Sequence, residues 1–335
     1  MKALFFISII TILFGCNTDK KFSERKKLSE LKKTEFIPTL ENKIVADKNS
    51  VYCATLLFAW DEIRKEINSP LTISSAYTEL NLLNNSKSFE NVLKNNEFNS
   101  TVEIDGDLIF AKVEFNKSLP FEFKLQSFNN KLVFDKEKVS SFGVTGYSSG
   151  EEIRNVKIIY YKNDNNFIIK LLPKEKEHEI ILYKSEQNFN SIAEMWNEME
   201  KQIKTGKSEI KNDKISWKYY INEEDEIIIP KFNFNIETNY ASLEGKDFNT
   251  KTQNYTIERA WQRTAFILDE SGAEIESEAE VAVVLEEIEE IEEIEKPKPK
   301  KMIFDKPFLI LLKRTDAKNP YFGLWTTNTE LMIKE

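Results

Sequence analysis

The clearest pattern in the chain is an alternation of small or apolar residues with glutamates in residues 273–283. One face carries Ala273, Ile275, Ser277, Ala279, Val281 and Val283, and the other carries Glu274, Glu276, Glu278 and Glu280. A period of two residues is typical of a β-strand with one buried face. The pattern therefore predicts a strand, although the glutamate-rich sequence that follows is too charged to pack in a core.

Other segments predict helices near the start of the chain and strands in its middle. Apolar spacing predicts helices in residues 51–68, from Ser69-Pro70 onward and in residues 192–203. β-Branched and aromatic runs between charged turns predict strands in residues 131–134, 139–144, 156–161, 166–173 and 178–183.

The first residues resemble a secretory signal. Met1-Lys2 is followed by a short apolar run that ends in Leu13-Phe14-Gly15-Cys16. The run is too short to span a bilayer as a helix, and its end resembles a bacterial lipobox. We expect a signal peptide in residues 1–15, lipidation of Cys16, a polar tether in residues 16–42 and a lipid-anchored position in the bacterial cell envelope, with an unlipidated secreted form as the alternative.

The scarcity of cysteine and histidine limits the possible chemistry. Only Cys53 remains besides Cys16, which excludes a disulfide framework or a cysteine metal cluster, and we expect Cys53 to be a small buried hydrophobe. His178 is the only histidine, and its charged surroundings predict a solvated side chain. Nucleophilic arrangements of the Ser-His or Cys-His type are therefore excluded unless His178 is the base. We expect no enzyme activity, no metal and no cofactor; a carboxylate-based hydrolase would rest only on the abundance of Asp and Glu.

Charge is concentrated in the segment after the alternating strand. The chain has 56 acidic and 47 basic residues, and 13 of the acidic ones lie in residues 269–295, which hold no Lys or Arg. Dense like charge opposes compaction. With 41% hydrophobic and 12% aromatic residues, residues 43–335 can form one large domain from which an extended loop, about residues 273–303, projects. Nucleic acid is an improbable partner for such an acidic surface.

Two motifs around the alternating strand resemble the serpin family. An acidic turn with glycine, Asp269-Glu270-Ser271-Gly272, precedes the strand, and the chain returns through Phe304-Asp305-Lys306-Pro307-Phe308, of the form F-x-x-P-F. Further similarities lie in Ser69-Pro70-Leu71 and in Leu119-Pro120-Phe121-Glu122. Residues 88–98 resemble the family's short helix, and residues 101–115 resemble the strand that borders its insertion site. Pro230-Lys231-Phe232 resembles a bend between two of its strands, and residues 307–312 and 321–326 resemble the two central strands of its rear sheet. An ordinary hairpin with a low-complexity loop is the alternative interpretation.

The resemblance implies an α+β serpin-like fold with mixed and antiparallel sheets, a helical N-terminal part and an exposed reactive-type loop near the C-terminus. It also implies an endopeptidase inhibitor, in which a serine or cysteine protease cleaves the loop, the strand inserts into a sheet and the acyl-enzyme is trapped. The implied hinge is Gly272, Ala273, Ile275, Ser277 and Ala279, and the candidates for the scissile region are Leu285, Glu286, Glu287, Ile288, Ile291 and Ile294.

The chain also departs from the family pattern. After about Glu97, several helices and two sheet strands that are typical of serpins are missing. Ile275 is bulky and three glutamates follow it in the hinge, whereas inhibitory serpins favour small residues there; Asp107 and Gln262 replace an asparagine and a histidine. The alternative hypothesis is therefore a non-inhibitory surface-binding lipoprotein that uses the same scaffold and the acidic loop.

Overall fold

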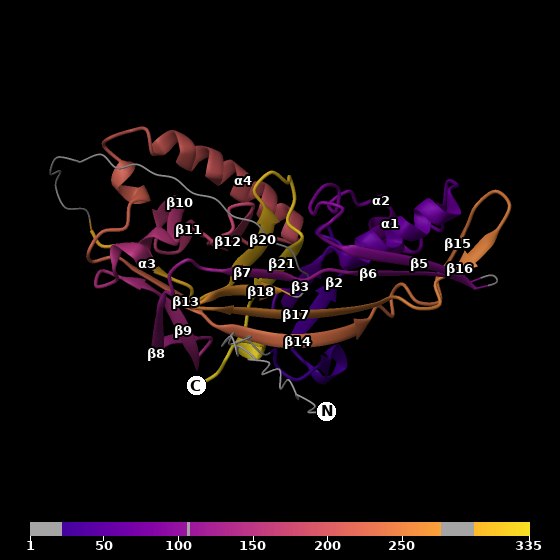
Figure 1. Ribbon diagram of the computed structural model, residues 1–335, viewed down its shortest axis with the longest axis horizontal. Helices are drawn as coiled ribbons and strands as arrows, with labels where there is room; N and C mark the ends of the chain where they lie inside the picture. Colours follow the sequence, from indigo (N-terminus) through magenta and orange to yellow (C-terminus); the bar gives the residue numbers. More distant parts are fainter. Residues whose placement is uncertain (1–21, 106–107, 276–297) are drawn as a thin grey trace, which may run out of the picture.

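A computed structural model of the protein describes residues 22–105, 108–275 and 298–335 (Figure 1). The described chain is α+β and rich in strands. Its α-helices are α1 (Thr55–Ile67), α2 (Thr78–Asn85), α3 (Gly150–Arg154) and α4 (Ile192–Glu209), and short 3-10 helices span Leu28–Glu30, Ser216–Tyr219 and Thr329–Leu331. The helix predicted for residues 192–203 is confirmed as α4, whose first turn is capped by Ser191 accepting a hydrogen bond from the Glu194 amide.

A five-stranded sheet runs along the long axis of the molecule (Figure 1). Its order is β1-β14-β17-β18-β7, with bounds Lys26–Lys27, Phe232–Asn239, Trp261–Asp269, Gly272–Ile275 and Lys117–Pro120. β14 and β17 pair antiparallel over residues 232–239 and 261–268, whereas β1 pairs parallel to β14. The expectation of mixed sheets is therefore correct.

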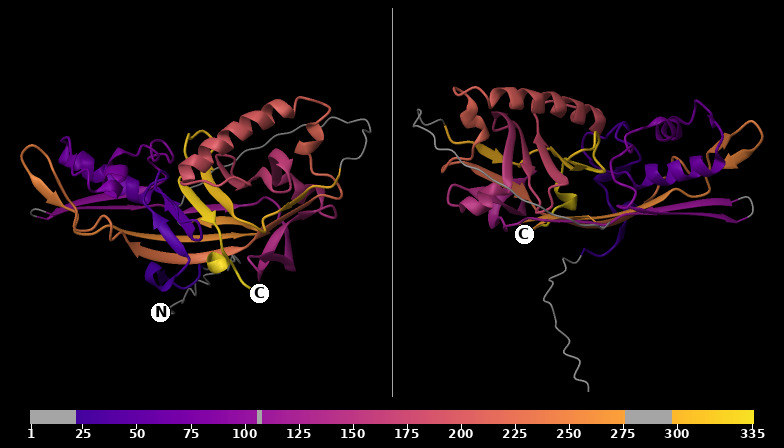
Figure 2. Two further views of the ribbon diagram at one scale, coloured as in Figure 1. Left: turned by 180° about the vertical axis from the view of Figure 1, so that it is seen from behind. Right: turned by 45° about the horizontal axis from the view of Figure 1, so that its top comes forward.

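A seven-stranded sheet forms the rear of the core. Its order is β10-β11-β12-β20-β21-β3-β2, with bounds Val156–Asn163, Asn166–Leu171, His178–Lys184, Phe308–Arg314, Phe322–Thr326, Asn49–Cys53 and Thr34–Ile37. All seven residues of β12 and of β20 are buried. As predicted, the two C-terminal strands lie side by side near the centre of this sheet. α4 packs on the same side of the molecule as β10–β12, as Figure 2 shows from two further directions.

Three smaller sheets complete the fold. The four-stranded sheet has the order β19-β13-β9-β8, with bounds Lys301–Ile303, Glu226–Pro230, Glu137–Thr145 and Gln126–Phe134. The chain passes directly from β13 to β14 at Lys231, so the predicted bend at Pro230-Lys231-Phe232 carries it from this sheet into the five-stranded one. The remaining strands are β16 (Asn254–Thr256), β15 (Asp247–Asn249) and β4 (Thr72–Ile73) in one sheet, and β5 (Asn99–Asp105) with β6 (Leu108–Glu114) in a hairpin.

The N-terminal part is less helical than predicted. Residues 49–53, at the start of the expected helix 51–68, form the buried strand β3, and α1 begins at Thr55. The segment expected to start a second helix at Ser69-Pro70 instead contributes β4, and residues 88–98 hold turns with no helix. Packing also begins before residue 43, because β2 pairs with β3 and buries Phe36 and Ile37.

His178 is not solvated, contrary to the prediction. It is the first residue of β12 and is 3% exposed. The charged residues before it belong to the preceding turn, whereas the imidazole faces the core. Cys53 is buried as expected, at the end of β3 rather than on a helix.

Candidate functional site

The hinge predicted from the alternating pattern begins inside the five-stranded sheet. Gly272 to Ile275 form β18, which pairs antiparallel with β17 on one side and with β7 on the other. Ala273 and Ile275 are buried, whereas Glu274 lies on the opposite face and is partly exposed. The structure thus places the first part of the alternating segment between two strands. Ser277, Ala279 and all the scissile candidates, residues 285–294, lie outside the described residues, as do Cys16 and Asp107.

Gly272 is required by the geometry of the turn into β18. Its φ is +130°, and a Cβ at this position would lie 2.3 Å from the carbonyl oxygen of Leu119. Side chains other than hydrogen are strained in that conformation. Glycine therefore allows β18 to approach β7 closely enough to pair with it.

The turn before Gly272 is held from several directions. The Ser271 amide donates to Asp269 Oδ1 at 2.7 Å, which is a common stabilising contact of tight turns. The Lys231 ammonium lies 2.6 Å from Glu270 Oε2, and the Phe121 amide donates to the Ser271 carbonyl. Burial alone would raise the pKa of Glu270, but the ion pair with Lys231 lowers it. The hinge is therefore anchored at its start.

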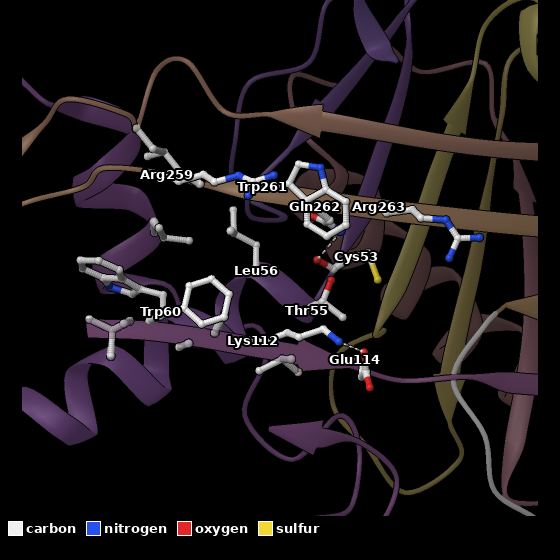
Figure 3. Close-up of a pocket in the computed structure, with 18 of the residues that line it drawn as sticks. Cys53, Thr55, Leu56, Trp60, Lys112, Glu114, Arg259, Trp261, Gln262 and Arg263 are labelled. Atoms are coloured by element: carbon white, nitrogen blue, oxygen red, sulfur yellow. Dashed lines mark hydrogen bonds and ion pairs between the residues drawn. The ribbon is translucent and has the colours of Figure 1, made fainter. Parts of the chain in front are cut away.

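A cavity of about 1330 Å³, shown in Figure 3, lies beside β18, and Ile275, the last residue of β18, is one of the residues that line it. One wall is the first half of β17, residues 261–265, and the other is β6 with the residues that follow it, 109–116. The floor is apolar and includes Leu56, Trp60 and Ile63 of α1. We call this cavity the slot.

The two walls of the slot are strand edges. Residues 261–265 pair with β14 on their far side, and β6 pairs with β5 on its far side. Among the residues that the structure describes, no strand pairs with either edge across the slot. Unpaired strand edges carry backbone donors and acceptors that favour the addition of a strand.

Gln262 provides a polar group in the wall of the slot. It is 4% exposed; its Oε1 accepts a hydrogen bond from the Tyr240 hydroxyl at 2.6 Å, and its Nε2 donates to Thr264 Oγ1 at 3.2 Å. Burial raises the pKa of Tyr240 well above its ordinary value, so the phenol remains a donor. Thus the side chain of Gln262 has hydrogen-bonding partners of its own in the wall of the slot.

A buried cluster of charges stands where β7 begins, at the end of the slot. The Glu97 carboxylate accepts hydrogen bonds from Lys117 Nζ at 2.6 Å, His178 Nε2 at 3.0 Å and Arg314 at 3.1 Å. The Tyr321 hydroxyl lies 3.3 Å from His178 Nδ1. Lys117 belongs to β7 and is the register partner of Ile275, whereas His178 and Arg314 belong to the rear sheet.

Sequence reasoning missed this cluster because its members are far apart in the chain. Burial alone would raise the pKa of Glu97, but the hydrogen bonds from His178 and Lys117 outweigh burial and lower it. Glu97 lies between α2 and β5. The only early signal was a lysine, at position 117, between apolar strand residues.

Two other kinds of feature, a membrane-spanning helix and a metal site, are absent from the described part of the chain. No helix there is long and apolar enough to cross a membrane. Likewise, within residues 22–105, 108–275 and 298–335, no group of three or more His, Cys, Asp or Glu side chains is placed to hold a metal ion.

Comparisons with known proteins gave matches among solved structures alone: no protein-family model and no curated protein matches the chain. The matching structures include a cleaved serpin, 42Da, at 8% identity and a TM-score of 0.33, covering 64% of this chain and 54% of that chain. Maspin matches at 14% identity and a TM-score of 0.33, covering 79% of this chain and 65% of that chain. A thyroxine-binding globulin in complex with thyroxine matches at 12% identity and a TM-score of 0.32, covering 81% and 66%. The chain thus covers less than two thirds of the first two structures, and similarity at this level does not assign it to a family.

Proposed function

We propose that the protein is a serpin-type inhibitor of a serine or cysteine endopeptidase. The protease cleaves the segment after the hinge, residues 276–283 enter the slot between β17 and β6, and the covalent acyl-enzyme is displaced with them. The observation that carries the proposal is the slot beside β18, whose two strand edges have no strand partner across it in the part of the chain that the structure describes.

The pairing of β18 defines how the following residues would fit. Ile275 is opposite Phe266 on β17 and Lys117 on β7. Continuing both registers by two-residue steps places Ser277 opposite Thr264 and Phe115, and then Ala279 opposite Gln262 and Val113. These side chains, and Val281 and Val283 after them, would face the apolar floor, because residues directly opposite in a sheet share a face.

The sequence limits the class of target protease. Residues 269–295 contain no Lys or Arg, whereas Leu285, Ile288, Ile291 and Ile294 alternate with glutamates in the scissile region. We infer that the target cleaves after an aliphatic residue or after glutamate, not after a basic one.

We further propose that lipid on Cys16 holds the protein to the bacterial cell envelope. The Ser23 amide donates to Asn233 Oδ1 at 2.8 Å, so the packed chain begins only a few residues after Cys16. Six residues, 16–21, span at most about 20 Å. Lipidated Cys16 should appear in mass spectra of membrane-extracted protein, and release of the protein into the medium with an unmodified Cys16 would contradict the anchor.

Insertion of residues 276–283 is tested by thermal unfolding. A recognition hexapeptide for a site-specific endopeptidase replaces residues 289–294, and melting temperatures are compared before and after a single cut, with the fragments still associated. Burial of Val281 and Val283 stabilises by about 1.5–3 kcal/mol each, so a rise in melting temperature of about 5–10 °C is expected.

Matched variants locate the inserted face. Val281→Arg places a charge toward the apolar floor and should abolish the rise, whereas Ala282→Arg faces outward and should preserve it. Ile275 is unsuitable for this purpose, because it is already buried in the uncut protein.

The protein with its natural segment distinguishes an inhibitor from a non-inhibitory binding protein. A protease that cuts the natural segment after an aliphatic residue or glutamate should give an adduct that resists SDS. If the melting temperature does not rise and no adduct forms, inhibition is excluded, and the non-inhibitory binding protein that uses its acidic loop remains.

A further inference from the structure

The outward rim of the slot carries cations at the positions that hinge glutamates would meet. On β17, Arg263 and Trp261 lie on the outer face, and the Arg259 guanidinium stands 5.7 Å above the Trp261 ring. On β6, Lys112 and Glu114 lie on the outer face and pair with each other, with side chains 55% and 59% exposed. Figure 3 shows these two groups on opposite sides of the cavity.

The registers of β18 fix the neighbours of each later glutamate. Glu274 is opposite Ile267 and Ser118. Continuing the same pairing places Glu276 between Ala265 and Asn116, then Glu278 between Arg263 and Glu114, and finally Glu280 between Trp261 and Lys112. Glu276 thus has no charged direct neighbour, whereas Glu278 and Glu280 each have one cation, Arg263 and Lys112 respectively.

We propose that Lys112 and Arg263 are positioning residues that pair with Glu280 and Glu278 when residues 276–283 occupy the slot. This inference rests on the proposed function and explains how a hinge with charged residues can insert. Opposite charges directly across a strand pair stabilise it, whereas like charges destabilise it. Without the two cations, glutamates two residues apart on one face would repel one another, and Glu278 would also meet Glu114.

The apolar floor alone does not require these pairs. It selects the face of the inserting strand, since a slip of one residue would turn every glutamate toward Leu56, Trp60 and Ile63. The rim adds a second selection, because it favours negative charge at two defined positions on the outer face. A hinge without charges could also insert, but Lys112 would not stabilise it through an ion pair.

Charge reversal in the cleavable protein tests the pairing. In Lys112→Glu, the rise in melting temperature on cutting should be smaller than in the parent by a few degrees. Combining Lys112→Glu with Glu280→Lys should restore the rise, because the pair is rebuilt with its charges exchanged. Arg263→Glu with Glu278→Lys should behave in the same way.

For each variant, the melting temperature of the uncut protein is subtracted from that of the cut protein. An effect of the substitution on the uncut fold is therefore removed from the comparison. Lys157→Glu, on the exposed face of β10, is the matched control and should leave the rise unchanged. If cutting raises the melting temperature of the parent protein and of Lys112→Glu by the same amount, the proposed pairing is wrong and the proposed function stands. If the parent does not rise at all, insertion itself is excluded, and the pairing with it.

Discussion

At the scale of single residues, the Glu97 cluster joins the two main sheets where the slot ends. Glu97 is 6% exposed and bonds Lys117 on the five-stranded sheet as well as Arg314 and His178 on the rear sheet. A buried charge is tolerated because several donors compensate its loss of hydration. We infer that the cluster fixes the position of β7 and therefore one wall of the slot.

Replacing Glu97 by Gln should destabilise the uncut protein by about 3–5 kcal/mol, because Lys117 and Arg314 would lose their buried counter-charge. Urea unfolding followed by tryptophan fluorescence measures this loss. Glu90→Gln removes only an exposed pair with Lys87 at 3.7 Å and should change the free energy of unfolding by less than about 1 kcal/mol. Equal effects of the two substitutions would show that the cluster does not stabilise the fold.

The cluster also predicts a dependence of stability on pH. The pKa of Glu97 is lowered in the fold, so the stabilisation it gives is complete above the carboxyl pKa of the unfolded chain, about 4.3, and is lost as the pH falls further. The midpoint of urea unfolding should therefore decrease below about pH 4.5. The slope should be shallower in Glu97→Gln, which has no carboxylate to protonate, and an unchanged slope would argue against Glu97 as a source of the acid sensitivity.

At the scale of elements, the entry of the chain into β18 depends on one glycine. Gly272→Ala should destabilise the protein by about 1–3 kcal/mol, since the added methyl group is strained at φ +130° and meets the Leu119 carbonyl. At Gly150, by contrast, an added Cβ would meet nothing within 4 Å, and Gly150→Ala should be nearly neutral. Calorimetric melting of both variants makes the comparison.

The segment between β18 and β19 should respond selectively to proteases. Lys296 and Lys298 each precede proline, and Lys300 is fully buried, with its ammonium 2.6 Å from Asp225. Trypsin should therefore leave residues 264–299 intact, whereas a glutamate-specific protease should make its first cut in residues 286–295. Fragment masses after brief digestion decide between these outcomes; a first glutamate-specific cut in residues 101–183 would show that the strand-rich body is loosely folded.

Local patterns predicted some elements of this fold well and others poorly. The strands of residues 131–183 and α4 follow from periodicity, which is a local signal, whereas the bend at Lys231 was expected from the resemblance at Pro230-Lys231-Phe232. β3 was missed because its apolar residues run directly into those of α1, and a short buried strand and a helix are then indistinguishable by period. In the Glu97 cluster, His178 lies 81 positions and Arg314 lies 217 positions from Glu97, and no local pattern contains such contacts. The hinge could be located from its alternation, but the slot beside it could not.

At the scale of the whole molecule, the segment between β18 and β19 connects strands of two different sheets. The segment leaves β18 in the five-stranded sheet and returns at β19, which pairs parallel with β13 in the four-stranded sheet. Beyond β19, the chain supplies β20 and β21. β20 pairs with β12 on one side and with β21 on the other, and β21 pairs with β3.

This arrangement changes the molecularity of folding once the chain is cut. The C-terminal fragment holds central strands of the rear sheet, so it is retained by a complete set of ladder hydrogen bonds and leaves only when the sheet itself unfolds. The cut protein is then a two-chain complex, whose refolding from denaturant is bimolecular, whereas the uncut protein refolds as one chain. The refolding yield of cut protein should fall on dilution, and that of uncut protein should not. A cell could therefore make the cut form by proteolysis, but once it unfolded at low concentration it would have no efficient route back.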